Sequence, residues 1–201
     1  MDNKFVITIS REFGSMGRPI AMKLAELLNI RFYDRDIVEQ TAQNLGVPVS
    51  TIKENEESIK NKFFNMTLPL GNDATEQQDM IFNEQVKIIR DFADKGSCII
   101  VGRCADYVFG NDKNAFKVHV YAPYEARLRN CVDILRLDRE TAKKTIKKVD
   151  KARKAYHMYY AGYAPGDPSN LDLLINSEVF GINGTAEALA KLMKVRFNLE
   201  E

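Results

Sequence analysis

The chain has 201 residues, of which 45% are hydrophobic, enough for one globular domain with a full core. Its 29 Lys and Arg residues nearly balance its 28 Asp and Glu residues, so any anion site must be local. Because the charges nearly balance, we expect neither nucleic-acid nor membrane binding. No apolar run approaches the ~20 residues that span a bilayer. The N-terminus shows no leader pattern. Cys98, Cys104 and Cys131 lack zinc or redox spacing, which favours a reducing, cytoplasmic location.

The first predicted element is an apolar strand from Phe5 to Ile9, followed by a glycine-containing turn and an amphipathic helix. This order brings backbone N–H groups to the carboxyl edge of a sheet, where they bind phosphate. The turn departs from the signature G-x-x-x-x-G-K-[ST], because Glu12, Arg18 and Pro19 stand at the first glycine, the lysine and the hydroxyl position. On the loop alone, a plain strand-to-helix turn is an equal alternative.

Four further segments read as buried strands, each separated from the next by a helical pattern. They are Arg31–Tyr33, Ser97–Val101, Phe116–Tyr121 and Leu171–Ile175. The intervening helices have apolar faces at Ile20, Leu24, Leu27 and Leu28, at Ile81, Val86, Ile89 and Phe92, and at Ala188, Leu189, Leu192 and Val195. This alternation predicts a three-layer α/β fold with a parallel sheet and a ligand at the carboxyl ends of its strands.

Two regions interrupt the alternation. Residues 47–79 are polar and mixed, and we interpret them as an insert or a cover. Residues 138–167 are rich in lysine and arginine and then in tyrosine. A basic helix is usually a solvated face, but this one leaves the same sheet edge as the glycine loop. It is therefore a candidate lid over phosphates, with Tyr159 and Tyr160 packing it against the core.

Several separated motifs together resemble the cytidylate kinase-like family of P-loop proteins, relatives of the nucleoside monophosphate kinases. They are Ile9–Arg18, Phe32–Arg35, Ile100–Tyr107, Asp150–Arg153, Tyr159–Gly162 and Asp172–Asn176. The resemblance implies a single P-loop NTPase-like domain over residues 1–201, with a five-stranded parallel sheet, a helical insert at 47–79 on the acceptor side and a basic lid at 138–167. It also implies a nucleoside triphosphate with Mg²⁺ as cofactor, and a nucleotide or another phosphorylated small molecule as partner.

The resemblance also implies roles for individual residues. The donor phosphates would be held by Gly14, Ser15, Met16, Gly17 and Arg18. The acceptor would be held by Arg35, Arg103 and Asp172, and the catalytic groups would be Arg18, Arg103 and Arg153. Simpler roles stay open, because Arg103 could pair with Asp106, Arg35 could cap a surface helix, and Asp172 could bond to the backbone of a turn.

Three functions follow from this reading. The first is transfer of the γ-phosphoryl group of a nucleoside triphosphate to a nucleoside monophosphate, plausibly CMP or dCMP. The second is a kinase-fold module that binds a nucleotide or phosphorylated metabolite without turnover. It is favoured by four residues that depart from the expected catalytic pattern, Glu12, Arg18, Pro19 and Cys104. The third is a kinase with another small-molecule acceptor.

Two groups of side chains remain without a settled role. Phe63, Phe64 and Met66 would line the acceptor pocket if the protein is a kinase with another acceptor. They could also form a subunit interface or simply pack under a long loop. Asp34, Asp36 and Asp106 are the candidate metal ligands, with no choice among them.

Overall fold

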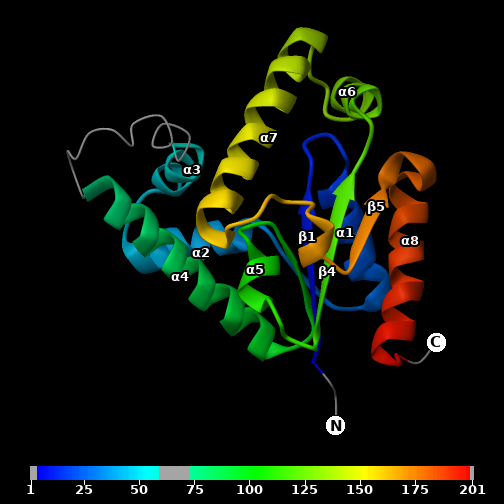
Figure 1. Cartoon of the computed structure of the whole chain (residues 1–201), viewed down its shortest axis with the longest axis horizontal. Coiled ribbons are helices and arrows are strands. Elements are labelled where there is room, and N and C mark those ends of the chain that lie inside the picture. The colour runs from blue at the N-terminus through cyan, green and yellow to red at the C-terminus, as the bar shows by residue number, and fades with distance from the viewer. Residues whose placement is uncertain (1–3, 59–72, 200–201) are drawn as a thin grey trace.

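The computed structural model describes residues 4–58 and 73–199, which form three layers around a parallel sheet (Figure 1). Its strands run in the order β2-β3-β1-β4-β5 and all pair in parallel. Their bounds are Val6–Arg11 for β1, Arg31–Tyr33 for β2, Cys98–Val101 for β3, Ala115–Tyr121 for β4 and Leu173–Asn176 for β5. The predicted α/β fold with a five-stranded parallel sheet is therefore confirmed.

Helices cover both faces of the sheet. Helices α1 (Gly17–Leu28) and α8 (Ser177–Phe197) pack on one face, while α2 (Arg35–Leu45), α4 (Asp73–Lys95) and α5 (Ala105–Phe109) pack on the other. Helix α3 (Val49–Ser58) packs beside α2 and α4. Helices α6 (Tyr124–Asp133) and α7 (Arg139–Ala161) pair with each other, and α7 stands over the carboxyl ends of the strands (Figure 1). A 3₁₀ turn at Pro168–Asn170 precedes β5.

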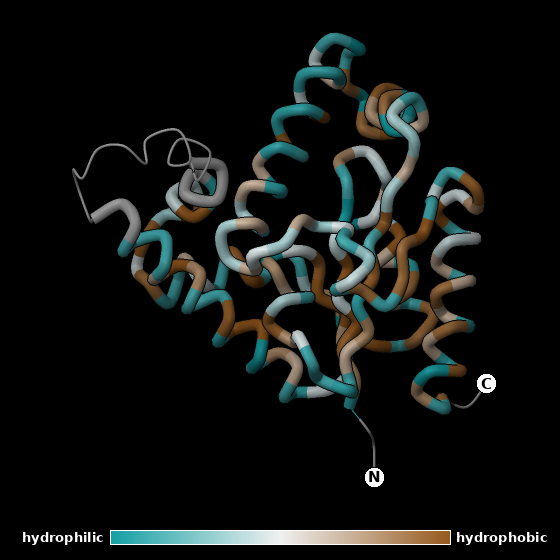
Figure 2. The backbone as a smooth tube through the Cα atoms, in the orientation of Figure 1, coloured by the Kyte–Doolittle hydropathy of each residue, from teal (hydrophilic) through white to brown (hydrophobic). Residues whose placement is uncertain are grey.

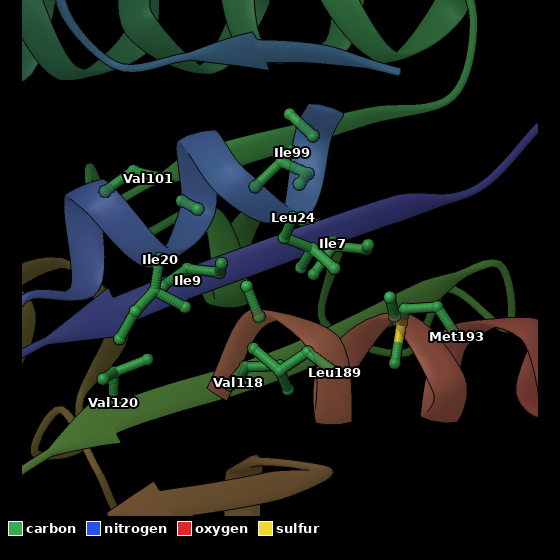
Figure 3. Close-up of a cluster of buried hydrophobic side chains, with 14 of the residues drawn as sticks. Ile7, Ile9, Ile20, Leu24, Ile99, Val101, Val118, Val120, Leu189 and Met193 are labelled. Atoms are coloured by element: carbon green, nitrogen blue, oxygen red, sulfur yellow. The ribbon is translucent and has the colours of Figure 1, made fainter. Parts of the chain in front are cut away.

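The main core lies between the sheet, α1 and α8. Ile7 and Ile9 of β1 are fully buried on this face, where Ile20 of α1 and Leu189 of α8 meet them (Figure 3). Val6, one position out of phase, packs instead with the helices of the opposite face, as the two-residue period of a strand requires. Hydropathy follows the same division: the strands are mainly apolar, and α7 is mainly polar (Figure 2).

The predicted core face of the last helix is wrong in part. Leu192 and Val195 are 43% and 79% exposed, whereas Leu189 and Met193 are buried. The chain leaves helical geometry at Gly181, where φ is 65°, and small residues of α8 then face the sheet together with Leu189 and Met193. The buried face of α8 therefore combines small residues, which allow the helix to approach α1, with Leu189 and Met193. Leu192 and Val195 lie on the other side of the helix.

The described parts of the two interrupting regions are largely helical. Residues 47–79 contain α3 and the start of α4, and the segment with Phe63, Phe64 and Met66 lies outside the described residues. Residues 138–167 contain α7 as one helix. The ring of Tyr160 stacks on Phe82 of α4 at 3.8 Å, as expected for packing against the core, whereas Tyr159 is exposed. Among the described helices, none is both long and apolar enough to cross a bilayer.

Candidate functional site

The loop between β1 and α1 turns inward at Gly14. The φ angle of Gly14 is +82°, and a Cβ atom there would lie 2.7 Å from the carbonyl oxygen of Arg127 on α6. Asn130 of α6 donates a 2.9 Å hydrogen bond to the Gly14 carbonyl. Glycine is therefore required at this position both by its backbone conformation and by the close approach of α6.

Several donors of this loop already bond within the protein. The N–H of Glu12 donates to the Val120 carbonyl, and that of Ser15 donates to the Glu12 carbonyl. The Ser15 side chain is fully buried, and its hydroxyl lies 3.0 Å from each of the same two carbonyl oxygens. Ser15 therefore shapes the loop and does not face a ligand.

The start of α1 offers few donors to an anion. Met16 precedes the helix with φ 60°, and its side chain packs in the core. Pro19 has no N–H, and the N–H of Ile20 donates to the Met16 carbonyl. Helix geometry provides no acceptor for the N–H groups of Gly17 and Arg18, which are thus the helix donors suited to a phosphate.

The Arg18 side chain lies on the rim of the site. Its Nε donates a 2.6 Å hydrogen bond to Oδ2 of Asp34, and the side chain is 43% exposed. Asp34 follows β2 and is buried. The pair holds the Arg18 guanidinium at the carboxyl end of β2, beside the ring of Phe32.

A cavity of about 280 Å³ opens beside the loop, at the carboxyl ends of β1 and β3 and beneath α7. Its charged and polar lining comes from three parts of the chain. These residues are Ser10 and Arg11 of β1, Arg103 and Asp106 after β3, and Lys148, Arg153 and His157 of α7. Figure 1 shows how α7 reaches back over these strand ends.

Positive charge dominates the cavity wall. Arg103 stands in a turn that follows β3, where Gly102, Arg103 and Cys104 all have positive φ angles. Arg153 donates a 3.1 Å hydrogen bond to the Arg11 carbonyl. Burial lowers the pKa of Arg153, the charge of Arg103 acts in the same direction, and Asp150 opposes both. Crowded, partly desolvated cations of this kind are stabilised by a bound anion.

One buried ion pair joins α7 to α5. Nε2 of His157 lies 2.8 Å from Oδ2 of Asp106, and Nδ1 of His157 lies 2.8 Å from the Tyr163 carbonyl oxygen. Because both ring nitrogens of His157 face acceptors, the arrangement favours the imidazolium form. Burial alone would lower the pKa of His157, but the hydrogen bond and charge of Asp106 raise it above its ordinary value.

A second histidine lies behind the cavity lining, next to Ser10. Nδ1 of His119, on β4, lies 2.8 Å from the Ser10 hydroxyl oxygen. Burial lowers the pKa of His119 to about 4, and the charge of Asp106 only partly offsets this. His119 is therefore neutral at pH 7.

Helix α7 is docked onto the loop by Asp150. One carboxylate oxygen of Asp150 accepts a 2.7 Å hydrogen bond from the Phe13 N–H, and the other accepts from Arg127 of α6. Arg127 also donates to the Phe13 carbonyl and faces Glu12 at 3.3 Å. The loop, α6 and α7 are thus joined by one network of charge-assisted bonds.

The structure brings Arg103 and Arg153 together at the cavity, but not Arg35 or Asp172. Arg35 is an exposed residue at the first position of α2. Asp172 precedes β5, at the opposite end of the sheet, where its carboxylate accepts the Lys117 N–H at 2.8 Å. The sequence left open a bond from Asp172 to the backbone of a turn, whereas the observed partner is the backbone of β4.

The candidate metal ligands do not form a ready Mg²⁺ site. Asp34 faces Arg18 and, at 4.0 Å, Arg11, while Asp106 faces His157 and Tyr163. Asp36 is exposed in the first turn of α2. Within the described ranges, no three His, Cys, Asp or Glu side chains cluster as metal ligands do. The buried carboxylates are already neutralised by cations, so no chemical step is assigned to a metal here.

Sequence reasoning missed Arg11, Asp150 and His157. The position of Arg11 at the end of β1 was the available signal, because ligands gather at the carboxyl ends of parallel strands. The partners of Asp150 and His157 are 137 and 51 residues away along the chain, so no local pattern indicates them.

Comparisons with known proteins agree with this geometry. A model of the cytidylate kinase-like family matches residues 6–179. An uncharacterized protein from Eubacterium ventriosum is similar in structure, with a TM-score of 0.72, 25% identity, and coverage of 95% of this chain and 99% of that one. No match was found among curated proteins.

Shikimate kinases share the fold alone. The enzyme from Bacteroides thetaiotaomicron has a TM-score of 0.55 and 12% identity, and the match covers 94% of this chain and 98% of that one. The enzyme from Acinetobacter baumannii, in complex with shikimate, has a TM-score of 0.52 and 12% identity, with coverage of 98% and 96%.

Proposed function

Because the chain belongs to the cytidylate kinase-like family, we propose that it transfers the γ-phosphoryl group of a nucleoside triphosphate to a nucleoside monophosphate, with CMP or dCMP as the acceptor. The observation that carries this proposal is the convergence of Arg103, Lys148 and Arg153 on one cavity at the carboxyl ends of the strands. Phosphoryl transfer depends mainly on alignment and charge neutralisation, which such a cavity supplies.

In this proposal the acceptor phosphate lies in the cavity. The guanidinium of Arg103 can make two parallel bonds to phosphate oxygens, and Arg153 neutralises charge that builds up during transfer. The donor phosphates lie against the backbone of Gly14–Gly17, with Arg18 steering them from the rim. The roles of Arg35 and Asp172 in acceptor binding stay predictions.

Helix α7 and its neighbouring turn would act as the lid, and residues 47–79 would cover the acceptor side. The contacts of α7 support this, because Asp150 and Arg153 bond to the donor loop while His157 bonds to α5. A helix that touches both the donor and the acceptor sides can exclude water from both at once.

The test is CDP or dCDP formation from ATP and the monophosphate. Arg103→Ala should lower kcat/KM at least tenfold, because a lost charge-assisted bond is worth ~1.5–3 kcal/mol. The matched control is Arg31→Ala, at an exposed position that begins β2 at the other end of the sheet. Undiminished turnover in Arg103→Ala would remove this residue from the chemistry.

A binding module without turnover is the second candidate, and the loop itself favours it. The N–H groups of Glu12, Phe13 and Ser15 all have acceptors within the protein. A thermal-shift screen with ATP, GTP, CMP, dCMP, UMP and AMP separates the two functions. Stabilisation by ~2.7 kcal/mol at 100 times Kd, with no diphosphate formed from any pair, would favour the module. Products from an acceptor other than CMP or dCMP would instead identify a kinase with a different substrate.

A further inference from the structure

Two arginines flank the loop, and both guanidinium groups approach Asp34. Arg11 ends β1, lines the cavity, and has a side chain only 14% exposed. Arg18, in the first turn of α1, is 43% exposed and bonds to Asp34. Arg18 is the residue that occupies the lysine position of the phosphate-loop signature. The cation inside the cavity is therefore not the one that the signature indicates.

Two glycines make room for the Arg11 side chain. A Cβ atom on Gly17 would lie 2.7 Å from the Cβ of Arg11, and one on Gly102 would overlap Nη1 of its guanidinium. Gly17 begins α1 and Gly102 follows β3, so both the first and the last part of the side chain run against bare backbone. Nη2 lies 4.0 Å from Oδ1 of Asp34, so the guanidinium also faces this carboxylate.

This path connects the two halves of the site. The backbone of Arg11 directly precedes the donor loop, and its carbonyl accepts the bond from Arg153. The guanidinium lies against Gly102, next to Arg103 on the acceptor side. Arg11 thus lies between the residues proposed to bind the donor phosphates and those proposed to bind the acceptor phosphate.

We propose that Arg11 is a catalytic residue whose guanidinium contacts the transferring phosphoryl group. This inference rests on the proposed kinase function. In the step, an oxygen of the acceptor phosphate forms a bond to the γ-phosphorus while the bond to the bridging oxygen breaks. The electron pair leaves with the nucleoside diphosphate. Arg11 exchanges no proton, and it neutralises the negative charge shared between the entering and leaving oxygens.

The kinetic test compares Arg11→Ala, Arg11→Lys, Arg18→Ala and the control Arg31→Ala, with ATP and CMP as substrates. Arg11→Ala should lower kcat at least 100-fold, a larger factor than its effect on KM for either substrate, because the contact is strongest in the transition state. Arg11→Lys should recover at least tenfold of that loss by returning the charge without the fork. Arg18→Ala should mainly raise KM for ATP. A larger kcat loss in Arg18→Ala than in Arg11→Ala would overturn the proposal.

A binding test with inorganic pyrophosphate does not depend on the acceptor. By titration calorimetry, Arg11→Ala should weaken pyrophosphate at least tenfold and Arg31→Ala less than twofold. If the unmodified protein binds pyrophosphate but forms no diphosphate from any nucleotide pair, the proposed kinase activity fails. A loss of pyrophosphate affinity in Arg11→Ala would in that case still support the Arg11 contact. Unchanged pyrophosphate affinity in Arg11→Ala overturns the contact, and no binding by the unmodified protein overturns both proposals.

A second variant covers the case in which Arg11→Ala fails to fold. Gly102→Ala fills the space of the guanidinium, and Gly46→Ala adds the same methyl group at a similar φ angle, +66° against +79°, with no atom within 4 Å. Both carry the backbone strain of a left-handed residue, but only Gly102→Ala displaces Arg11. Pyrophosphate affinity that falls only in Gly102→Ala supports the proposal, and equal affinities in the two variants contradict it.

Discussion

Acid should destabilise this protein through one histidine. His119 is buried on β4, its Nδ1 faces Ser10, and its ring packs against Gly166. Burial lowers the pKa of His119 from 6.5 to about 4; Asp106 and Asp150 pull it upward, whereas His157 and Arg153 push it further down. In the unfolded chain the same imidazole titrates near its ordinary value.

The sign of the effect follows from proton binding. Between pH 6.5 and pH 4 the unfolded chain binds more protons at His119 than the folded protein does, so stability falls as the pH falls. At 1.36 kcal/mol per pKa unit, this loss is about 2 kcal/mol at pH 5 and approaches about 3 kcal/mol below pH 4. For a protein of this size, 2 kcal/mol corresponds to a Tm decrease of roughly 4–8 °C.

His119→Asn isolates this contribution. The asparagine amide can keep a partner for Ser10 near the position of Nδ1 but cannot take up a proton. Urea unfolding at pH 7 and pH 5 gives the free energy of unfolding for both proteins. The difference between wild type and variant should shift by about 2 kcal/mol in favour of the variant at pH 5. Parallel pH profiles would refute the buried, neutral state of His119, because all other titrating groups are common to both proteins.

Three further substitutions test the loop and its contacts with the helices. Asp150→Asn removes the charge that accepts hydrogen bonds from the loop and from α6. Because the Asp150 side chain is only 28% exposed, we expect the free energy of unfolding in urea to fall by about 2 kcal/mol. An unchanged unfolding midpoint would argue against the network. Because the pKa of His157 is raised in the folded protein, its contribution to stability is present below pH ~6.5 and is lost as the pH rises through the folded pKa. His157→Gln should therefore lower the free energy of unfolding more at pH 6 than at pH 9. An equal loss at both pH values would contradict the imidazolium form. Gly14→Ala should lower the free energy of unfolding by about 1 kcal/mol more than Gly46→Ala does, because its methyl group meets α6. Equal losses in the two variants would show that α6 moves away from the loop.

The sheet was predictable because buried parallel strands are short, nearly continuous apolar runs. β2 begins and ends at the predicted residues, and β3 and β4 differ by one residue at their starts. β5 begins two residues late, at Leu173. Before it, Asp172 and Lys117 exchange two hydrogen bonds, one through the Asp172 side chain, which holds the chain at the sheet without extending the strand.

The candidate site was predictable in its place but not in its detail. The ends of β1 and β3 meet at one edge, which indicated the loop and Arg103 from their order in the sequence. The direction of Arg11 depends on Gly102, 91 positions away, where the missing side chain leaves the space that the guanidinium fills. Such a contact forms only when the strands pair in register. Neither Arg11 nor Gly102 therefore indicates it in the sequence.

The docking of α7 also bears on how the loop would receive a phosphate. Asp150 and Arg153 lie three residues apart on one face of α7, and they bond to the Phe13 N–H and the Arg11 carbonyl on either side of Glu12. A carboxylate that accepts the Phe13 N–H competes with any phosphate for the same hydrogen. Asp150→Asn, although less stable, should therefore bind ATP more tightly by calorimetric titration. If its ATP affinity falls instead, the Phe13 N–H does not belong to the donor site, and Asp150 supports nucleotide binding by holding the loop in shape.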